Sequence, residues 1–241
     1  MDIFLRADAW MALLSLTALE IVLGVDNILF ISILTSKLPE RKQQSRARKQ
    51  GLFYALLVRL LFLFGIGYII RATDPIVHIS SFALSAKDLI LLLGGLFLLY
   101  KSTKEIHEKV SGEETAKEIK PKKINFSTII VQIVLLDIVF SFDSILTAIG
   151  LTEHIVIMAS AIVISMIIMI IFIDTVGNFI IKHPTLQVLG LSFLILIGTL
   201  LIAEAFHYEI PKGYIYFAFF YSFVIELINM RLRPKTLNNE T

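Results

Sequence analysis

Two apolar stretches of the sequence each contain a pair of acidic residues at the same spacing. The first stretch carries Glu20 and Asp26, and the second carries Asp137 and Asp143. In both stretches a small residue lies between the acids and a short polar residue follows the second acid: Gly24 and Asn27, then Ser141 and Ser144. Every member of the second set lies 117 positions after its counterpart in the first. This regularity indicates an internal repeat.

Carboxylates among apolar side chains point to cation or proton chemistry. A buried charge is costly, so such acids are protonated, or a cation lies among them. Carboxylates together with amide and hydroxyl oxygens are hard ligands that suit Mn²⁺, Mg²⁺ or Ca²⁺. Zn²⁺ and copper sites usually recruit Cys or His, but the chain has no Cys and its apolar stretches have no His. We therefore predict a divalent metal site whose candidate ligands are Glu20, Asp26, Asp137, Asp143, Asn27 and Ser144.

The alternative interpretation is that these acids are protonated and form structural hydrogen bonds between helices. Four further residues are candidate accessory residues of the site: Arg59, Asp174, Glu226 and Asn229. Arg59 would neutralise an acid or bind a carbonyl, and Asp174, its approximate repeat counterpart, is one candidate partner. Asp174 alternatively lies at an ordinary charged helix end. For Glu226 and Asn229, the alternative to a role in the site is an ordinary position at the membrane interface.

The composition is that of a membrane protein. Of the 241 residues, 56% are hydrophobic and 17% are charged, and the mean hydropathy is +0.81, whereas soluble domains carry about 25% charged residues. The net charge of +2 gives no reason to expect a nucleic acid partner. A helix that crosses a bilayer needs about 20 mostly apolar residues. Seven such segments are predicted: Trp10–Ser36, Gly51–Ile70, Ala83–Tyr100, Ile124–Gly150, Ile155–Ile173, Leu186–Ala203 and Gly213–Met230.

Lys and Arg are distributed unevenly between the predicted segments. Most of them lie in Lys37–Gln50, in Lys101–Lys123, at Lys182 and in the C-terminal tail. Since basic loops face the cytoplasm, we expect a multi-pass protein of a bacterial plasma membrane with its N-terminus outside and its C-terminus in the cytoplasm. The loop Lys101–Lys123 is expected to be a solvated helix and linker, with a site for lipid headgroups or a protein partner as the alternative.

The two acidic motifs begin three segments apart, so they cross the bilayer in opposite directions. This predicts an all-α membrane fold built as an inverted repeat of three plus three helices with a seventh helix added. The expected boundaries within this single transmembrane domain are about 10–100 for repeat 1, 101–123 for the cytoplasmic loop, 124–203 for repeat 2 and 213–230 for the last helix.

In such a fold the acids form two layers, Glu20 with Asp143 and Asp26 with Asp137, about 9 Å apart along the helices. The two acids of one helix point about 120° apart, because six residues turn through about 600°. Two interpretations of the small residues between the acids remain open. A local break of the helix there would re-aim the second acid, or the small residues allow close packing of helices.

Several motifs resemble those of the TerC family of integral membrane proteins, which is named for tellurium resistance. They are E-I-V-L-G-V-D-N from Glu20, G-G-L-F-L-L-Y-K ending at Lys101, D-I-V-F-S-F-D-S from Asp137, and Tyr214-Ile215-Tyr216 followed by Glu226 and Asn229. The resemblance implies a fold similar to that of the LysE-type transporters. It also implies manganese efflux, metallation of exported enzymes or tellurite resistance, and a plastid relative is linked to membrane-protein insertion. By resemblance, the four acids inherit the metal-site role.

The sequence therefore predicts a transporter that exports a divalent cation, with Mn²⁺ favoured by the resemblance and proton coupling as an added feature. The expected partners are the metal ion, the lipid bilayer and other membrane proteins, and no prosthetic group is expected. The competing hypothesis is an assembly or insertase partner, or a tellurite-resistance scaffold, without transport. An enzyme is not expected, because the apolar segments contain neither a G-x-G-D motif nor a Ser-His pair.

Overall fold

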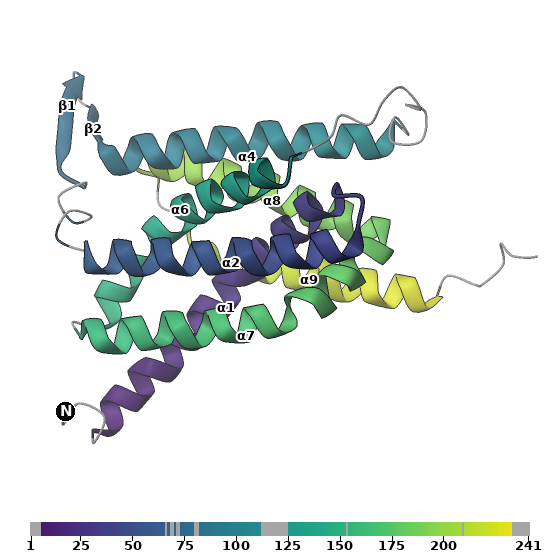
Figure 1. The fold of residues 1–241 in the computed structure, drawn as a ribbon. Coiled ribbons are helices and arrows are strands. Elements are labelled where there is room, and N and C mark those ends of the chain that lie inside the picture. Colours follow the sequence, from purple (N-terminus) through teal and green to yellow (C-terminus); the bar gives the residue numbers. More distant parts are fainter. Residues whose placement is uncertain are drawn as a thin grey trace, which may run out of the picture.

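The computed structural model describes residues 6–65, 67, 70, 73–79, 82–111, 125–152, 154–208 and 210–232. This part of the chain is helical except for one short hairpin (Figure 1). Its helices are α1 (Ala7–Ser36), α2 (Arg41–Phe64), α4 (Ala86–Val110), α6 (Phe126–Leu151), α7 (Ile155–Lys182), α8 (Pro184–Ala205) and α9 (Lys212–Leu232). The antiparallel strands β1 (Pro75–Ile79) and β2 (Phe82–Ser85) form the hairpin.

Each of the seven predicted segments corresponds to one of these helices, but the helices are not equally suited to a bilayer. By length and composition, five described helices could cross a membrane: α1, α6, α7, α8 and α9. In α2 and α4, charged residues near the ends interrupt the apolar part, and α2 also contains Arg59. The structure therefore gives an all-helical bundle with five candidate spans, and the prediction of seven is confirmed only as seven helices.

Two predicted boundaries are wrong. The basic stretch Arg41–Gln50 is not a loop but the first part of α2, because Arg, Lys, Gln and Ala are good helix formers. Ala83 does not begin a helix, since it lies in β2, and α4 begins only at Ala86. There the Ser85 hydroxyl accepts from the Asp88 amide, and the Asp88 carboxylate accepts from the Ser85 amide. This reciprocal cap stops the helix from extending into the hairpin.

The main packing partners lie far apart in the sequence. Helix α1 packs chiefly on α7, α2 packs on α6 and α7, and α4 packs on α8. In the last pair the backbones approach closely, because a Cβ atom on Gly95 would lie 2.6 Å from the carbonyl oxygen of Gly198. Helix α9 packs mainly on α8, where Phe193 contacts Phe219 with their ring centroids 4.1 Å apart. The centre of the bundle is therefore formed by α1, α2, α6 and α7.

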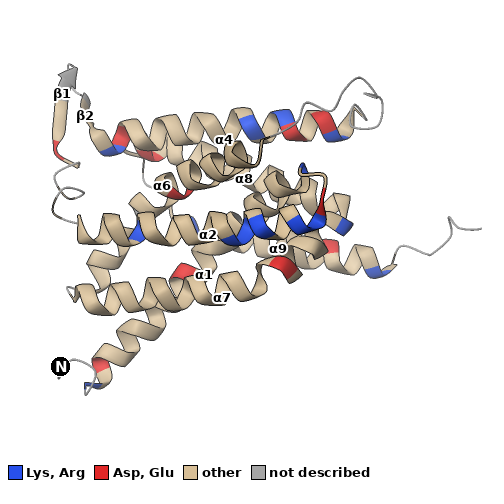
Figure 2. Ribbon diagram, viewed as in Figure 1, with Lys and Arg blue, Asp and Glu red and all other residues tan. Residues whose placement is uncertain are grey.

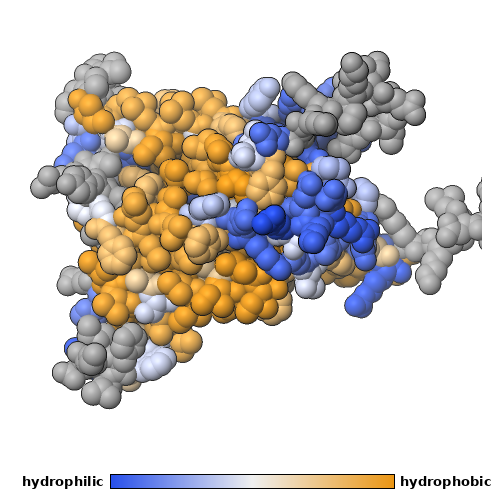
Figure 3. Space-filling view, viewed as in Figure 1, coloured by the Kyte–Doolittle hydropathy of each residue, from blue (hydrophilic) through white to orange (hydrophobic). Residues whose placement is uncertain are grey.

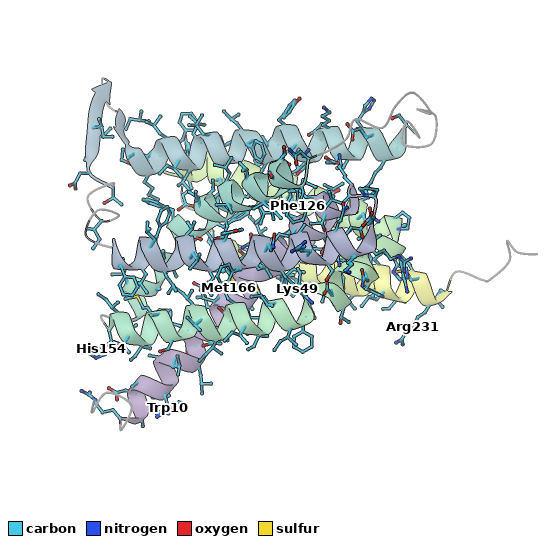
Figure 4. All side chains as sticks on the ribbon, viewed as in Figure 1. Trp10, Lys49, Phe126, His154, Met166 and Arg231 are labelled. Carbon is cyan, nitrogen blue, oxygen red and sulfur yellow. The ribbon has the colours of Figure 1, made fainter. Side chains whose placement is uncertain are left out.

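Charged residues gather at one end of the bundle, which we call the basic end. It contains the start of α2 and the last turns of α4 and α9 (Figure 2). Lys49 and Arg231 point to this side, whereas His154 and Trp10 lie toward the other end (Figure 4). Between the two ends the surface in view is largely hydrophobic (Figure 3). A wide apolar surface of this kind fits contact with lipid chains.

Candidate functional site

The centre of the bundle holds a buried ion-pair cluster around Arg59 of α2. Arg59 Nη1 donates to Glu20 Oε2 of α1 at 2.5 Å, and Nη2 donates to Asp137 Oδ1 of α6 at 2.7 Å. Arg59 Nε also lies 3.1 and 3.2 Å from the two oxygens of Asp137. All three residues are at most 4% exposed. The cluster thus joins helices from the two predicted repeats through charge-assisted hydrogen bonds.

Polar neighbours complete the shell around both acids. Asn27 Nδ2 donates to Asp137 Oδ1 at 3.3 Å, and the Ser141 hydroxyl donates to Asp137 Oδ2 at 2.9 Å. The Ser144 hydroxyl, which donates to the Ser141 backbone carbonyl at 3.3 Å, also lies near Glu20. All three of these side chains are buried. Apart from nitrogen donors, the atoms that converge here are oxygens.

Two of these contacts are equivalent under the repeat. Asn27 bonds Asp137, and Ser144, the repeat counterpart of Asn27, lies near Glu20, the counterpart of Asp137. The contacts also fix the relative direction of the helices. As the chain advances from 20 to 27 on α1, its contacts on α6 go back from 144 to 137, so the two helices run antiparallel.

One acid of each predicted layer has its side chain outside the described part of the structure. Asp26 and Asp143 lie inside α1 and α6, directly before Asn27 and Ser144, but their side chains are outside the described part of the structure. The pairing of Glu20 with Asp143 and of Asp26 with Asp137 therefore stays a prediction. What the sequence did not indicate is that one guanidinium connects Glu20 to Asp137 across the two layers.

The helices do not break between their acids. Both α1 and α6 are continuous, so the expectation of local unwinding at Gly24 and Ser141 is wrong. Instead, a Cβ atom on Gly24 would collide with the side chain of Met169. The small residue lets α7 approach α1, as the packing alternative predicted.

A small cavity lies beside the cluster. Its volume is about 30 Å³, which is room for one or two water molecules. Its wall combines Arg59 and Ser144 with apolar groups and with two polar residues of α9, Lys212 and Tyr216. Among the residues that the structure describes, no group of three or more His, Asp or Glu side chains could hold a metal ion. The described part of the site is therefore two carboxylates and one guanidinium, with one negative charge in excess.

The accessory candidates lie elsewhere. Asp174 does not pair with Arg59. At the basic end it accepts from Ser45 at 2.7 Å and forms ion pairs with Arg48 and Lys49. Glu226 has one carboxylate oxygen buried without a partner among the described residues. Asn229, on the same helix, is exposed. Neither residue of α9 touches the Arg59 cluster through any described hydrogen bond.

Sequence reasoning missed the role of Arg48. This residue is fully buried, and its guanidinium donates to Thr35, Asp174 and Asn178. The signal was present in the helical periodicity. Counting from Arg48, the residues three, four, seven and eleven positions later are all buried, and the last of them is Arg59. Both arginines therefore belong to the buried face of α2.

The comparisons with known proteins agree on one family. The model of the "Integral membrane protein TerC family" matches residues 5–239. The chain is 49% identical over 223 residues to the UPF0053 inner membrane protein YgdQ of Escherichia coli, covering 92% of this chain and 93% of that protein. It is 46% identical over 226 residues to a UPF0053 protein of Haemophilus influenzae, covering 94% and 95% of the two chains.

A longer relative matches over the whole chain. The UPF0053 inner membrane protein YoaE of Escherichia coli is 41% identical over 241 residues, which are 100% of this chain and 46% of that protein. The chain thus corresponds to somewhat less than half of such longer relatives. No solved structure matches it.

Proposed function

Because the chain belongs to the TerC family of integral membrane proteins, we propose that it is a membrane carrier that exports a divalent cation, with Mn²⁺ as the substrate. The observation that carries the proposal is the buried polar contact between α1 and α6. There, acids from equivalent positions of a repeated motif lie together among hydroxyl and amide side chains. In this proposal Asp26 and Asp143 complete the ligand set, and the chain is neither an enzyme nor the holder of a prosthetic group.

The packing supports the proposed inverted repeat of three plus three helices. The exchange of α1 with α6, α2 with α7 and α4 with α8 converts each principal contact into another principal contact. The pair α1 with α7 becomes α6 with α2, while α4 with α8 and α2 with α7 are converted into themselves. An arrangement of this kind allows the two halves to rock around a fixed site.

The ligand chemistry supports a hard ion. The chain has no Cys, and the described side chains of the cluster that could bind an ion carry carboxylate, amide or hydroxyl oxygens. Such ligands favour Mn²⁺, Mg²⁺ or Ca²⁺ over Zn²⁺ or Cu⁺. The family resemblance then selects Mn²⁺. Proton coupling follows if acids left without a cation are protonated, since a buried carboxylate resists remaining charged.

Purified protein in liposomes tests the proposal. Wild type should move Mn²⁺ across the membrane, and Asp26→Asn or Asp143→Asn should lower the rate by about 10–100-fold, because each removes one charged ligand. Asp8→Asn is the matched control, since this acid of α1 is exposed and pairs with Arg6 outside the bundle. Undiminished Mn²⁺ transport in both variants would reject the site. Repeating the assay with and without a pH gradient tests proton coupling.

The proposed location is the bacterial inner membrane, with the basic end in the cytoplasm. Two of the relatives named above are described as inner membrane proteins, and basic segments stay on the cytoplasmic side. The absence of Cys makes the orientation easy to measure. In intact cells an impermeant thiol reagent should label Asp8→Cys but not Lys109→Cys, and the opposite labelling would reverse the orientation.

The competing function is a scaffold or insertase partner without transport, which includes a scaffold for tellurite resistance. It is favoured by the helical extension of α4 to Val110, where charged residues project beyond the predicted span. That hypothesis predicts that deletion of Gly112–Lys120, which lies outside the described residues, abolishes function while the acid-to-amide variants retain it. Mn²⁺ transport by the deletion variant would favour the carrier instead.

A further inference from the structure

We infer that Arg59 is a tethered substitute for the transported cation. Its guanidinium holds Glu20 and Asp137 while the site contains no metal ion, and it leaves them when an ion enters. This inference rests on the proposed function and goes beyond it, because it gives a part in the transport cycle to a residue that has no ligand atom for a metal. Arg59 is thus a positioning residue of the empty carrier.

The contacts place the guanidinium where a bridging cation would lie. Nη1 donates to Glu20, while Nε and Nη2 donate to Asp137. The two acids come from equivalent positions of the repeated motif on α1 and α6. Arg59 comes from a third helix, α2, and the residue 117 positions later, Val176, is uncharged. One arginine therefore serves both halves, as a single bound ion would.

A metal ion and Arg59 would compete for the same atoms. Both oxygens of Asp137 and one oxygen of Glu20 already accept from Arg59. A divalent cation bound to these oxygens would repel a guanidinium at contact distance, most strongly where water is excluded. Loading must therefore move Arg59 away from the acids. Arg59 also lines the small cavity with Ser144 and Tyr216, so its side chain is not packed against protein atoms on every side.

Arg59 would stabilise the buried acids of the carrier after the ion has left. After the ion has left, two buried acids without a counter-charge would oppose the return of the carrier to its first state. Arg59 is permanently charged in proteins, so it offsets one of their two negative charges at any pH. In this scheme Glu20 and Asp137 together need at most one proton during the return step, and further proton coupling would involve the other acids.

The variant Arg59→Gln separates binding from cycling. With the competitor removed, Mn²⁺ should bind the purified protein about tenfold or more tightly, since a competing occupant lowers the fraction of protein ready to bind. Net efflux of Mn²⁺ from liposomes should fall to background, because the empty carrier no longer returns. Exchange of radioactive Mn²⁺ for unlabelled Mn²⁺ should persist, because exchange needs only the loaded carrier.

Two further variants serve as controls. Arg48→Gln removes the other buried arginine of α2, which contacts α7 and not the acids of the cluster, so Mn²⁺ affinity and the ratio of net efflux to exchange should stay at the wild-type values. Arg59→Lys keeps the charge but has fewer donors, so it should retain net efflux and bind Mn²⁺ more tightly than wild type. This variant carries the test if Arg59→Gln does not fold.

The outcomes are distinct. Weaker Mn²⁺ binding in Arg59→Gln and Arg59→Lys, or loss of exchange together with net efflux, would mean that Arg59 only supports the structure, and the inference would be overturned. Wild-type protein that neither binds nor moves Mn²⁺ would overturn the proposed function itself. That result is read from wild type alone, independently of the Arg59 variants.

Discussion

Arg48 and Arg59 lie on the same face of α2, eleven residues or about three helical turns apart, yet their surroundings differ. Both side chains are almost inaccessible, with exposures of 0% and 2%. Arg59 contacts two acids that are themselves buried, on α1 and α6. Arg48 contacts Asp174 of α7, whose side chain is 27% exposed. Both arginines are thus buried, but Arg59 has buried acidic partners at the centre, whereas Arg48 has a partly exposed one at the basic end.

The charge balance reverses between the two places. Among the described side chains, one guanidinium meets two carboxylates at the centre, whereas Arg48 and Lys49 share one carboxylate at the basic end. An excess of negative charge in a dry site attracts a further cation, whereas a partly solvated pair with spare positive charge has no such demand. Arg48 is therefore best understood as a fixed connection between α2 and α7, and Arg59 as an exchangeable one.

The largest effect should come from removal of Arg59. Arg59→Met leaves Glu20 and Asp137 buried without a counter-charge, which should lower the free energy of unfolding by about 3–5 kcal/mol. The measurement is denaturant or thermal unfolding in detergent, followed by circular dichroism. If the comparison holds, added Mn²⁺ should restore part of this stability in the variant, because the ion takes the position that Arg59 has vacated.

Arg48→Met is the partner experiment. It should cost less, about 1–3 kcal/mol, because Asp174 remains partly hydrated and keeps its ion pair with Lys49. Added Mn²⁺ should not restore the stability of this variant. Equal losses for the two arginines, or rescue of both by Mn²⁺, would break the distinction between a fixed and an exchangeable ion pair.

The rigidity of the Arg48 site can be tested from the opposite helix. A Cβ atom on Gly177 of α7 would lie 2.8 Å from Arg48 Cζ and 2.8 Å from the Ser32 hydroxyl. Gly177→Ala should therefore destabilise the protein by about 1–3 kcal/mol through overpacking. Gly150→Ala, near the end of α6, has nothing within 4 Å of the new atom and should be neutral or slightly stabilising. An equally neutral Gly177→Ala would show that Arg48 moves freely.

These two sites also mark how far the sequence alone could lead. The repeated motif located Glu20, Asp137, Asn27 and Ser144, because equal spacing and burial cost are readable from residue types. The acidic partners of Arg59 were not readable, since they depend on how α1, α2 and α6 pack on one another, and such tertiary contacts leave no periodic trace in one sequence.

Other differences have local causes. The basic stretch before Gly51 was interpreted as a loop because its charge suits the membrane surface, although its residues favour a helix and continue the buried face of α2. The run Pro75–Ile79 is rich in β-branched residues and is followed by Ser80 and Ser81, a pattern that favours a strand. It lies between two predicted membrane segments, where no secondary structure was predicted. In both places the local propensity of the residues, for a helix or for a strand, was the better guide than the expected position of the membrane.

Asp174→Asn gives a smaller effect and sharpens the basic-end half of the comparison. The amide keeps an oxygen for the Ser45 hydroxyl, and Arg48 keeps Thr35 and Asn178 as partners. The expected loss in the free energy of unfolding is about 1 kcal/mol, as for other partly solvated ion pairs. Asp137→Asn, measured in parallel, should cost more because Asp137 is enclosed. A loss at Asp174 equal to that at Asp137 would contradict the assignment of only one of them to a dry site.

A third ion pair adds pH to the comparison. Lys37 Nζ donates to Glu105 Oε1 at 2.5 Å, and Lys101 lies 3.0 Å from the same oxygen. Glu105 lies on α4 beyond the predicted span, which ends at Tyr100. Burial alone would raise the pKa of Glu105, but the hydrogen bonds and charges of Lys37 and Lys101 outweigh it and lower the pKa below 4.5. Burial opposes the charge of Lys37 too, yet Glu105 and Glu108 together raise the pKa of Lys37 above 10.5.

The lowered pKa of Glu105 and the raised pKa of Lys37 both stabilise their ion pair at pH values between the two pKa values. For Glu105 the unfolded chain binds more protons than the folded one as the pH falls below about 5, so its contribution is complete above the unfolded pKa and is lost as the pH falls through the lowered folded value. The Lys37 contribution is complete below its unfolded pKa and is lost only as the pH rises through the raised folded value. The difference in unfolding free energy between wild type and Glu105→Gln should therefore be flat near neutral pH, at about 1–3 kcal/mol because this carboxylate is buried and hydrogen-bonded to two charged lysines, and should vanish in acid. A difference that grew on acidification would mean that Glu105 is already protonated in the folded protein, and the basic end would then resemble the buried centre more closely than its exposed charges indicate.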